Sequence, residues 1–211
     1  MKKIVSIVLA VSMLAVCVTG CKTTTRKQLK PVVLNEVAHS IFYAPQYAAI
    51  ELGYFEDEGL DLTLVNGAGA DKVMTALISG DADIGFMGSE ASIYVYQQGS
   101  DDYAVNFAQL PQRAGNILVG REAQDNFTWA DLKGKKVLGG RAGGMPEMVF
   151  EYILKKNGID PAADLTIDQS INFGLTAAAF TSNDADYTVE FEPFATGLEK
   201  EGNGHVIASL G

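Results

Sequence analysis

The sequence predicts an α/β protein built from two similar lobes, and three observations support this prediction. Short apolar runs alternate along the chain with stretches of helical periodicity, which is typical of βαβ units and a largely parallel sheet. The same alternation begins again after residue 129. In addition, Asp81-Ala82-Asp83 and Asp184-Ala185-Asp186 each follow a helical stretch and precede an apolar run. A repeated order of helix, acidic turn and strand favours two related lobes.

In the first lobe, glycine and proline mark several of the expected boundaries. Pro45 suits the first turn of a helix, and Gly53 and Gly80 suit helix ends. We expect strands at residues 32–38, 60–65 and 84–87, helices at 45–52, 71–79 and 89–98, and extended chain at 103–110 and 116–119.

The second lobe is expected to repeat this order around a glycine-rich loop at residues 139–144. The loop lacks the spacing of a Walker motif and of a dinucleotide-binding GxGxxG. Because the loop follows a strand and leads into a helix N-terminus, we expect it to face a ligand cleft, with a simple turn of positive φ as the alternative. The expected strands are at 136–138, 165–168, 187–191 and 205–208, and the expected helices are at 146–156, 175–180 and 195–200.

Residues 1–20 have the features of an export signal. The positively charged N-terminal segment Met1-Lys2-Lys3 precedes an apolar run of about 15 residues. This run is too short to cross a hydrocarbon core of ~30 Å comfortably. The run ends in Val18-Thr19-Gly20-Cys21, which resembles a bacterial lipobox. We expect acylation of Cys21, a polar tether over 21–31, and a location on the extracytoplasmic face of the cell membrane. The alternative is an ordinary signal peptide that contains a cysteine.

Composition excludes several classes of function. The formal net charge is −10, from 26 acidic and 16 basic residues, which argues against a nucleic-acid partner and against electrostatic attraction to anionic lipid. Both cysteines, Cys17 and Cys21, lie in the leader region, so the expected mature fold has no disulfide and no thiolate metal site. Hydrolase motifs such as Gly-x-Ser-x-Gly and His-Glu-x-x-His are absent. We expect a binding protein without a metal or cofactor.

The loops that follow the expected strands supply candidate ligand contacts, because parallel sheets bind ligands beyond the carboxyl ends of their strands. These loops are residues 39–43, 66–69, 88–90, 139–145 and 190–193. Their aromatic side chains, Phe42, Tyr43 and Phe191, suit stacking on a planar ring. Their carboxylates, Glu90, Glu190 and Glu192, suit ring nitrogens or an amine. The structural alternatives are that His39 caps a strand and that Phe42 and Tyr43 pack in the core.

Several blocks of the sequence resemble one branch of the solute-binding proteins of ABC importers. That branch takes up aliphatic sulfonates, nitrate or taurine, and pyrimidine precursors of thiamine. The blocks are HSIFYAPQYAA at 39–49, GYFEDEGL at 53–60, GDADIG at 80–85, DLKGKKV at 131–137 and EFEP at 190–193.

The resemblance implies a two-lobed periplasmic-binding-protein fold of type II, whose lobes close on a ligand by hinge bending. By this comparison, lobe 1 covers residues 32–112, lobe 2 covers 113–208, and 209–211 begins a return to lobe 1. Members of the family continue beyond this point. We therefore expect the C-terminal part of lobe 1 to be missing and apolar surface on lobe 1 to be exposed.

The resemblance also implies a lipid-anchored monomer that captures a small organic ligand and delivers it to an ABC permease and its ATPase. The residues expected to line the cleft are His39, Phe42, Tyr43, Gly88 and Glu90 from lobe 1, and Gly143, Gly144, Met145, Glu190 and Phe191 from lobe 2.

Several ligands and roles remain open. The aromatic and acidic residues favour a planar nitrogen compound such as a thiamine pyrimidine precursor, whereas Arg113 and Arg141 keep an aliphatic sulfonate, taurine or nitrate possible. Two alternatives from other classes are an enzyme similar to the thiamine-pyrimidine synthases of this fold and a surface lipoprotein that transports nothing. The export leader and the lack of the synthases' cysteine-rich motif argue against the enzyme.

Overall fold

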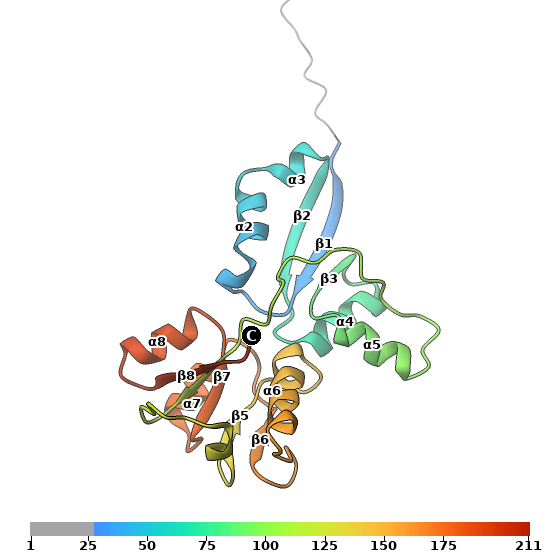
Figure 1. Ribbon diagram of the computed structural model, residues 1–211. Coiled ribbons are helices and arrows are strands. Elements are labelled where there is room, and N and C mark those ends of the chain that lie inside the picture. The colour runs from blue at the N-terminus through green and yellow to red at the C-terminus, as the bar shows by residue number, and fades with distance from the viewer. Residues whose placement is uncertain (1–27) are drawn as a thin grey trace, which may run out of the picture.

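The computed structural model describes residues 28–211, which form two α/β lobes connected by extended chain (Figure 1). The predicted leader, the predicted lipidation site at Cys21 and most of the predicted tether lie outside the described residues. Among residues 28–211, no helix combines the length and the apolar character needed to span a bilayer.

The first lobe contains a three-stranded parallel sheet in the order β2-β1-β3. Its strands are β1 (Lys30–Glu36), β2 (Leu60–Asn66) and β3 (Ile84–Phe86). Its helices are the short η1 (Ile41–Tyr43), α2 (Ala44–Glu51), α3 (Tyr54–Asp57), α4 (Ala70–Ser79) and α5 (Glu90–Gln97). The carboxyl ends of the parallel strands face the second lobe, so the loops after β1 and β3 lie between the lobes (Figure 1).

The second lobe contains a five-stranded sheet in the order β6-β5-β7-β4-β8. β5 runs parallel to β6 and β7, whereas β4 runs antiparallel to both β7 and β8. The strands are β4 (Ile117–Gly120), β5 (Lys136–Leu138), β6 (Thr166–Asp168), β7 (Tyr187–Glu190) and β8 (His205–Ser209); the helices are η2 (Trp129–Leu132), α6 (Met145–Lys156), α7 (Thr176–Ser182) and α8 (Phe194–Lys200). Leu118, Val137, Phe150 and Leu154 form the centre of its core.

The two lobes repeat one structural unit, as the duplicated acidic turn predicts. The backbone N–H of Asp83 donates to the carbonyl of Val33 at 2.9 Å, and its Oδ2 accepts from the N–H of Val33 at 2.8 Å. Asp186 makes the same two contacts with Lys136, at 2.8 and 2.9 Å. Each aspartate therefore attaches the turn before a strand, β3 or β7, to the neighbouring parallel strand, β1 or β5. This equivalence pairs β3 with β7 and β1 with β5.

The predicted α/β two-lobed class is confirmed, and most element boundaries fall within a few residues of the prediction. One difference is that residues 54–57 form the separate helix α3. Gly53 has the left-handed φ of 74°, which ends α2 and lets a new turn begin at once. The boundaries given above for lobes 1 and 2 remain predictions.

Candidate functional site

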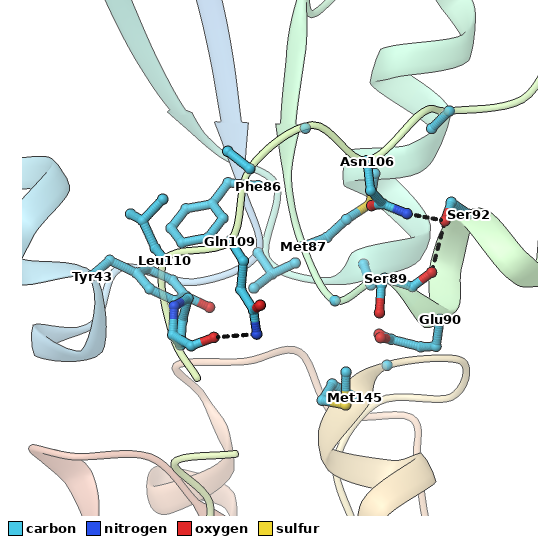
Figure 2. A pocket seen from close by; sticks show the side chains of 18 of the residues that line it. Tyr43, Phe86, Met87, Ser89, Glu90, Ser92, Asn106, Gln109, Leu110 and Met145 are labelled. Carbon is cyan, nitrogen blue, oxygen red and sulfur yellow. Dashed lines mark hydrogen bonds between the residues drawn. The ribbon is translucent and has the colours of Figure 1, made fainter. Parts of the chain in front are cut away.

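A cavity of about 830 Å³ lies between the lobes and continues into the first lobe. The part of its lining that involves both lobes, which we call the cleft wall, consists of Phe42, Tyr43, Gly88, Glu90, Gly144, Met145, Pro146, Val149, Phe173 and Phe191. A second part of the lining, which we call the sheet wall, consists of β3 and the extended residues 102–116. Figure 2 shows both walls, with Met145 of the second lobe opposite Glu90 of the first.

Glu90 is the chemically most distinctive residue of the cleft wall. It begins α5, its exposed fraction is 3 %, and neither of its carboxylate oxygens has a hydrogen-bond partner among the described residues. Burial raises the pKa of Glu90, while the backbone N–H groups of Glu90 and Met145 lower it. These two N–H groups lie near the carboxylate but make no hydrogen bond to it. A buried carboxylate without a hydrogen bond is costly, so this group is suited to a ligand that brings a hydrogen-bond donor or a positive charge.

Gly88 makes the position of this carboxylate possible. A Cβ atom at residue 88 would collide with both carboxylate oxygens of Glu90. The turn after β3 therefore leaves space above its backbone, and the Glu90 side chain folds back into that space.

Aromatic rings cover much of the remaining cleft wall. The ring centroids of Tyr43 and Phe86 lie 4.3 Å apart, and Phe42 packs edge-on to Tyr43 with centroids 6.3 Å apart. On the second lobe, Phe173 and Phe191 form a T-shaped pair with centroids 5.3 Å apart. Burial, with the nearby Glu36 carboxylate, raises the pKa of the Tyr43 phenol. Aromatic side chains that line a cavity in this way suit a flat ligand.

The start of α6 forms the floor of the cleft wall. Gly144 is the N-cap residue and has no side chain to cap the helix, and Pro146 stands in the first turn. The Gly143 N–H donates to Glu147 at 3.2 Å, and the Gly144 N–H donates to the carbonyl of Arg141 at 3.1 Å. The N–H of Met145 is turned toward the Glu90 carboxylate, so the positive end of the α6 dipole faces the cavity.

The cavity brings together seven of the ten residues proposed from the sequence. They are Phe42, Tyr43, Gly88, Glu90, Gly144, Met145 and Phe191.

His39 lies apart from the cavity. Its Nδ1 pairs with Glu36 Oε1 at 3.0 Å, and its ring stacks on Tyr47 with centroids 4.4 Å apart. Glu36 is fully buried and also accepts hydrogen bonds from Gln46 at 3.0 Å and from Tyr47 at 2.9 Å. His39 therefore completes a hydrogen-bonded group on the first lobe.

Gly143 and Glu190 are also outside the cavity lining. Gly143 lies one residue before the N-cap of α6. Glu190 is buried at the end of β7, where it accepts hydrogen bonds from Thr176 at 2.9 Å and Thr188 at 2.7 Å. Burial raises the pKa of Glu190 to about 7, and the two threonine hydroxyls oppose that shift.

Phe173 is a cleft-wall residue that the sequence reasoning missed. It follows β6, so the general position of ligand sites at strand ends points to it. The strand itself is only three residues long, and its weak apolar pattern in the sequence did not mark where the strand ends. In the part of the chain that the structure describes, no group of three or more His, Cys, Asp or Glu side chains is placed to hold a metal ion.

Two contacts connect the lobes beside the cleft wall. Arg141 of the second lobe pairs with Asp71 of α4, and its Nη1 also donates to Asn172 at 2.8 Å. The Ser40 hydroxyl donates to the carbonyl of Glu192 at 2.9 Å. The lobes are therefore held against each other in this structure.

Comparisons with known proteins agree with this architecture. A family model described as NMT1/THI5 like matches residues 41–206. The putative binding protein YtlA of Bacillus subtilis (strain 168) is 49 % identical over 192 residues, which are 91 % of this chain and 57 % of that protein. The chain thus spans little more than half the length of this relative.

Solved structures share the fold at low sequence identity. A protein from Bordetella bronchiseptica RB50 matches with a TM-score of 0.68 and 24 % identity, over 85 % of this chain and 56 % of that one. The periplasmic aliphatic sulphonate binding protein SsuA from Escherichia coli matches with a TM-score of 0.58 and 18 % identity, over 85 % and 60 %. The periplasmic nitrate-binding protein NrtA from Synechocystis PCC 6803 matches with a TM-score of 0.61 and 19 % identity, over 85 % and 51 %. Since the family model spans both lobes, the chain belongs to the NMT1/THI5-like family and has the two-lobed fold of type II periplasmic binding proteins.

Proposed function

We propose that this protein captures a small organic solute between its lobes and delivers it to an ABC permease. The observation that carries the proposal is the buried, unpartnered carboxylate of Glu90, which projects into a cavity walled by both lobes. A ligand that satisfies Glu90 while touching the second lobe favours the closed arrangement, because contacts from both lobes exist together only when the lobes are closed. The similarity to the putative binding protein YtlA and to the binding proteins SsuA and NrtA supports this role.

The favoured ligand is a planar nitrogen compound of the thiamine-pyrimidine-precursor type. Glu90 accepts hydrogen bonds from N–H groups, and the rings of Tyr43 and Phe191 provide faces for stacking. Sulfonate, taurine or nitrate is the alternative, because Arg113 is part of the cavity lining. Arg141 contributes less to that alternative, since its guanidinium is already bonded to Asp71 and Asn172.

The proposed location is the extracytoplasmic face of the cell membrane. Acyl chains on Cys21 would hold the protein there through the tether. An ABC permease with its ATPase would then receive the ligand from the closed form.

Calorimetric titration tests the ligand assignment. The purified protein is titrated with aminopyrimidine precursors of thiamine and, separately, with alkyl sulfonates, taurine and nitrate. We expect aminopyrimidine binding that Glu90→Gln weakens by about tenfold or more, which corresponds to about 1.4 kcal/mol. Glu122→Gln, a change at an exposed residue outside the cavity lining, serves as the matched control.

Each outcome of this titration has a defined meaning. Binding of a sulfonate or nitrate alone, unaffected by Glu90→Gln, would overturn the pyrimidine assignment and leave the transport role. Absence of binding by all candidates would contradict the transport role for this chain. Pyrimidine formation by the protein supplied with pyridoxal phosphate and iron would instead support a synthase-like enzyme.

A further inference from the structure

Buried polar atoms without a hydrogen-bond partner are concentrated at the cavity. Among the described residues, the buried side chains with such atoms are Asn35, Glu90 and Asn116. Glu90 and Asn116 both belong to the cavity lining, whereas Asn35 does not. Glu90 already has a role in the proposed function, but the amide nitrogen Nδ2 of Asn116 has none. Since the large majority of buried polar side-chain atoms are hydrogen-bonded, this unpartnered nitrogen calls for a partner from outside the chain.

Asn116 lies where the sheet wall meets the cleft wall. It is the last residue of segment 102–116 and directly precedes β4. In β4, Ile117 pairs with Glu190 of the antiparallel strand β7, so Asn116 comes opposite Phe191. Because directly opposite residues of an antiparallel pair have their side chains on the same face of the sheet, Asn116 and Phe191 stand side by side at the cleft.

The face of the sheet that carries Asn116 is the one that α6 covers. Side chains two residues apart in a strand point to the same face, and Leu118 packs in the core cluster that contains Phe150 and Leu154 of α6. Asn116 therefore lies on the α6 side of the sheet, at the cleft end of β4. The start of α6 forms the floor of the cleft wall at this end.

Aromatic residues of both lobes flank Asn116, whose exposed fraction is 1 %. A Cβ atom at Gly115 would collide with the ring of Phe42, so this ring of the first lobe packs against the backbone next to Asn116. Phe191 of the second lobe stands opposite Asn116 in the sheet. The donors and acceptors of a flat ligand lie at its edge, where a side-chain amide between two aromatic residues can reach them.

We propose that Asn116 is a ligand-binding residue whose Nδ2 donates a hydrogen bond to an acceptor at the edge of the ligand. This inference rests on the proposed function and narrows its ligand class. Glu90 and Asn116 together select a compound with at least one hydrogen-bond donor and one acceptor, because a carboxylate accepts and an amide NH2 group donates. An aminopyrimidine has both groups on one ring, whereas nitrate has no donor.

A titration cycle between protein and ligand tests the role of Asn116. The two ligands are the hydroxymethyl-aminopyrimidine precursor of thiamine and the aniline of the same shape, in which C–H groups replace both ring nitrogens. We expect Asn116→Leu to weaken binding of the aminopyrimidine by about tenfold and to change binding of the aniline by less than about twofold. Asn126→Leu, the same substitution at an exposed residue outside the cavity lining, is the matched control.

The stability of the ligand-free protein supplies a measurement that needs no ligand. Replacement of an unpartnered buried amide by an apolar side chain of similar size costs little. We therefore expect the urea midpoint of Asn116→Leu to equal or exceed that of the wild type. A lower midpoint would show that the Asn116 amide has a partner in the ligand-free protein and would overturn the proposal.

The titration separates a failure of this inference from a failure of the proposed function. Equal weakening of both compounds by Asn116→Leu would indicate a general change of the cleft and would overturn the role of Asn116. Aminopyrimidine binding that Asn116→Leu leaves unchanged would overturn that role while the proposed function stands. If the wild type binds neither compound, the aminopyrimidine assignment fails, and the role of Asn116 fails with it.

Discussion

Arg141 of the second lobe binds Asp71 of the first lobe through two hydrogen bonds of 2.6 Å. Its Nε donates to Oδ1 and its Nη2 donates to Oδ2. These residues are separated by 70 positions and lie on opposite sides of the cleft. The parallel, charge-assisted geometry fixes both distance and orientation, so this pair holds the two lobes in the arrangement that the structure shows.

Asp71→Asn should weaken the contact between the two lobes. The substitution keeps the size of the side chain but removes its charge, and the pair is partly exposed, so we expect a loss of about 1 kcal/mol from the closed state. Small-angle X-ray scattering should then report a larger radius of gyration.

Lys155→Ala is the matched control, because it removes the ion pair with Glu151 within the single helix α6. An unchanged radius of gyration in Asp71→Asn, or an equal change in both variants, would contradict a role of this pair in closure.

Glu90→Gln should stabilise the ligand-free protein while weakening ligand binding. The substitution replaces a buried acid whose two oxygens have no hydrogen-bond partner among the described residues with an amide. Because burial raises the pKa of Glu90, we expect the free energy of unfolding to rise by on the order of 1 kcal/mol at pH values where Glu90 is ionised. Chemical denaturation without ligand measures this effect. If Glu90→Gln destabilises the protein as an ordinary core substitution does, the carboxylate is satisfied in solution and the argument for a ligand at Glu90 weakens.

Gly88→Ala should impair binding with little effect on folding. The added methyl group would displace the end of the Glu90 side chain, which is flexible, so we expect a stability loss below about 1 kcal/mol and a loss of ligand affinity of about tenfold. Gly197→Ala in α8 is the control, since a Cβ there meets no atom within 4 Å. Equal ligand affinity in both variants would show that Gly88 does not position Glu90 for binding.

Glu190 should make stability depend on pH. Its pKa of about 7 in the folded protein lies above the ordinary value of 4.5. Between these values the folded state holds a proton that the unfolded chain has released, so the wild type loses stability as pH rises through 7.

Relative to the wild type, Glu190→Gln should therefore gain on the order of 2 kcal/mol between about pH 5 and about pH 8. Urea denaturation at several pH values measures the difference, and Glu122→Gln is again the control. Parallel stability curves for the wild type and Glu190→Gln would disprove a raised pKa at this residue.

The sequence predicts the fold and much of the candidate site because both depend on local signals. Apolar periodicity predicts the strands, and the position after a strand predicts Glu90 and Phe191. The repeat of Asp83 and Asp186 even predicts that the lobes correspond. These signals require only a few consecutive residues, which one sequence supplies.

Contacts between distant residues account for most of what the sequence does not reveal. The sequence around His39 does not indicate that Glu36 is fully buried and forms a hydrogen bond with the imidazole. Similarly, no pattern connects Asp71 to Arg141, so the arginine looks available for an anion until the structure shows its partner. Packing decides these cases, and packing depends on the whole fold.

The duplicated contacts of Asp83 and Asp186 have a consequence for how the molecule comes apart. In each lobe a carboxylate of that lobe holds the turn before β3 or β7, and neither contact uses a group from the other lobe. Loss of either aspartate contact should therefore unfold its own lobe first and leave the other lobe folded. Denaturation would then proceed in two separable steps.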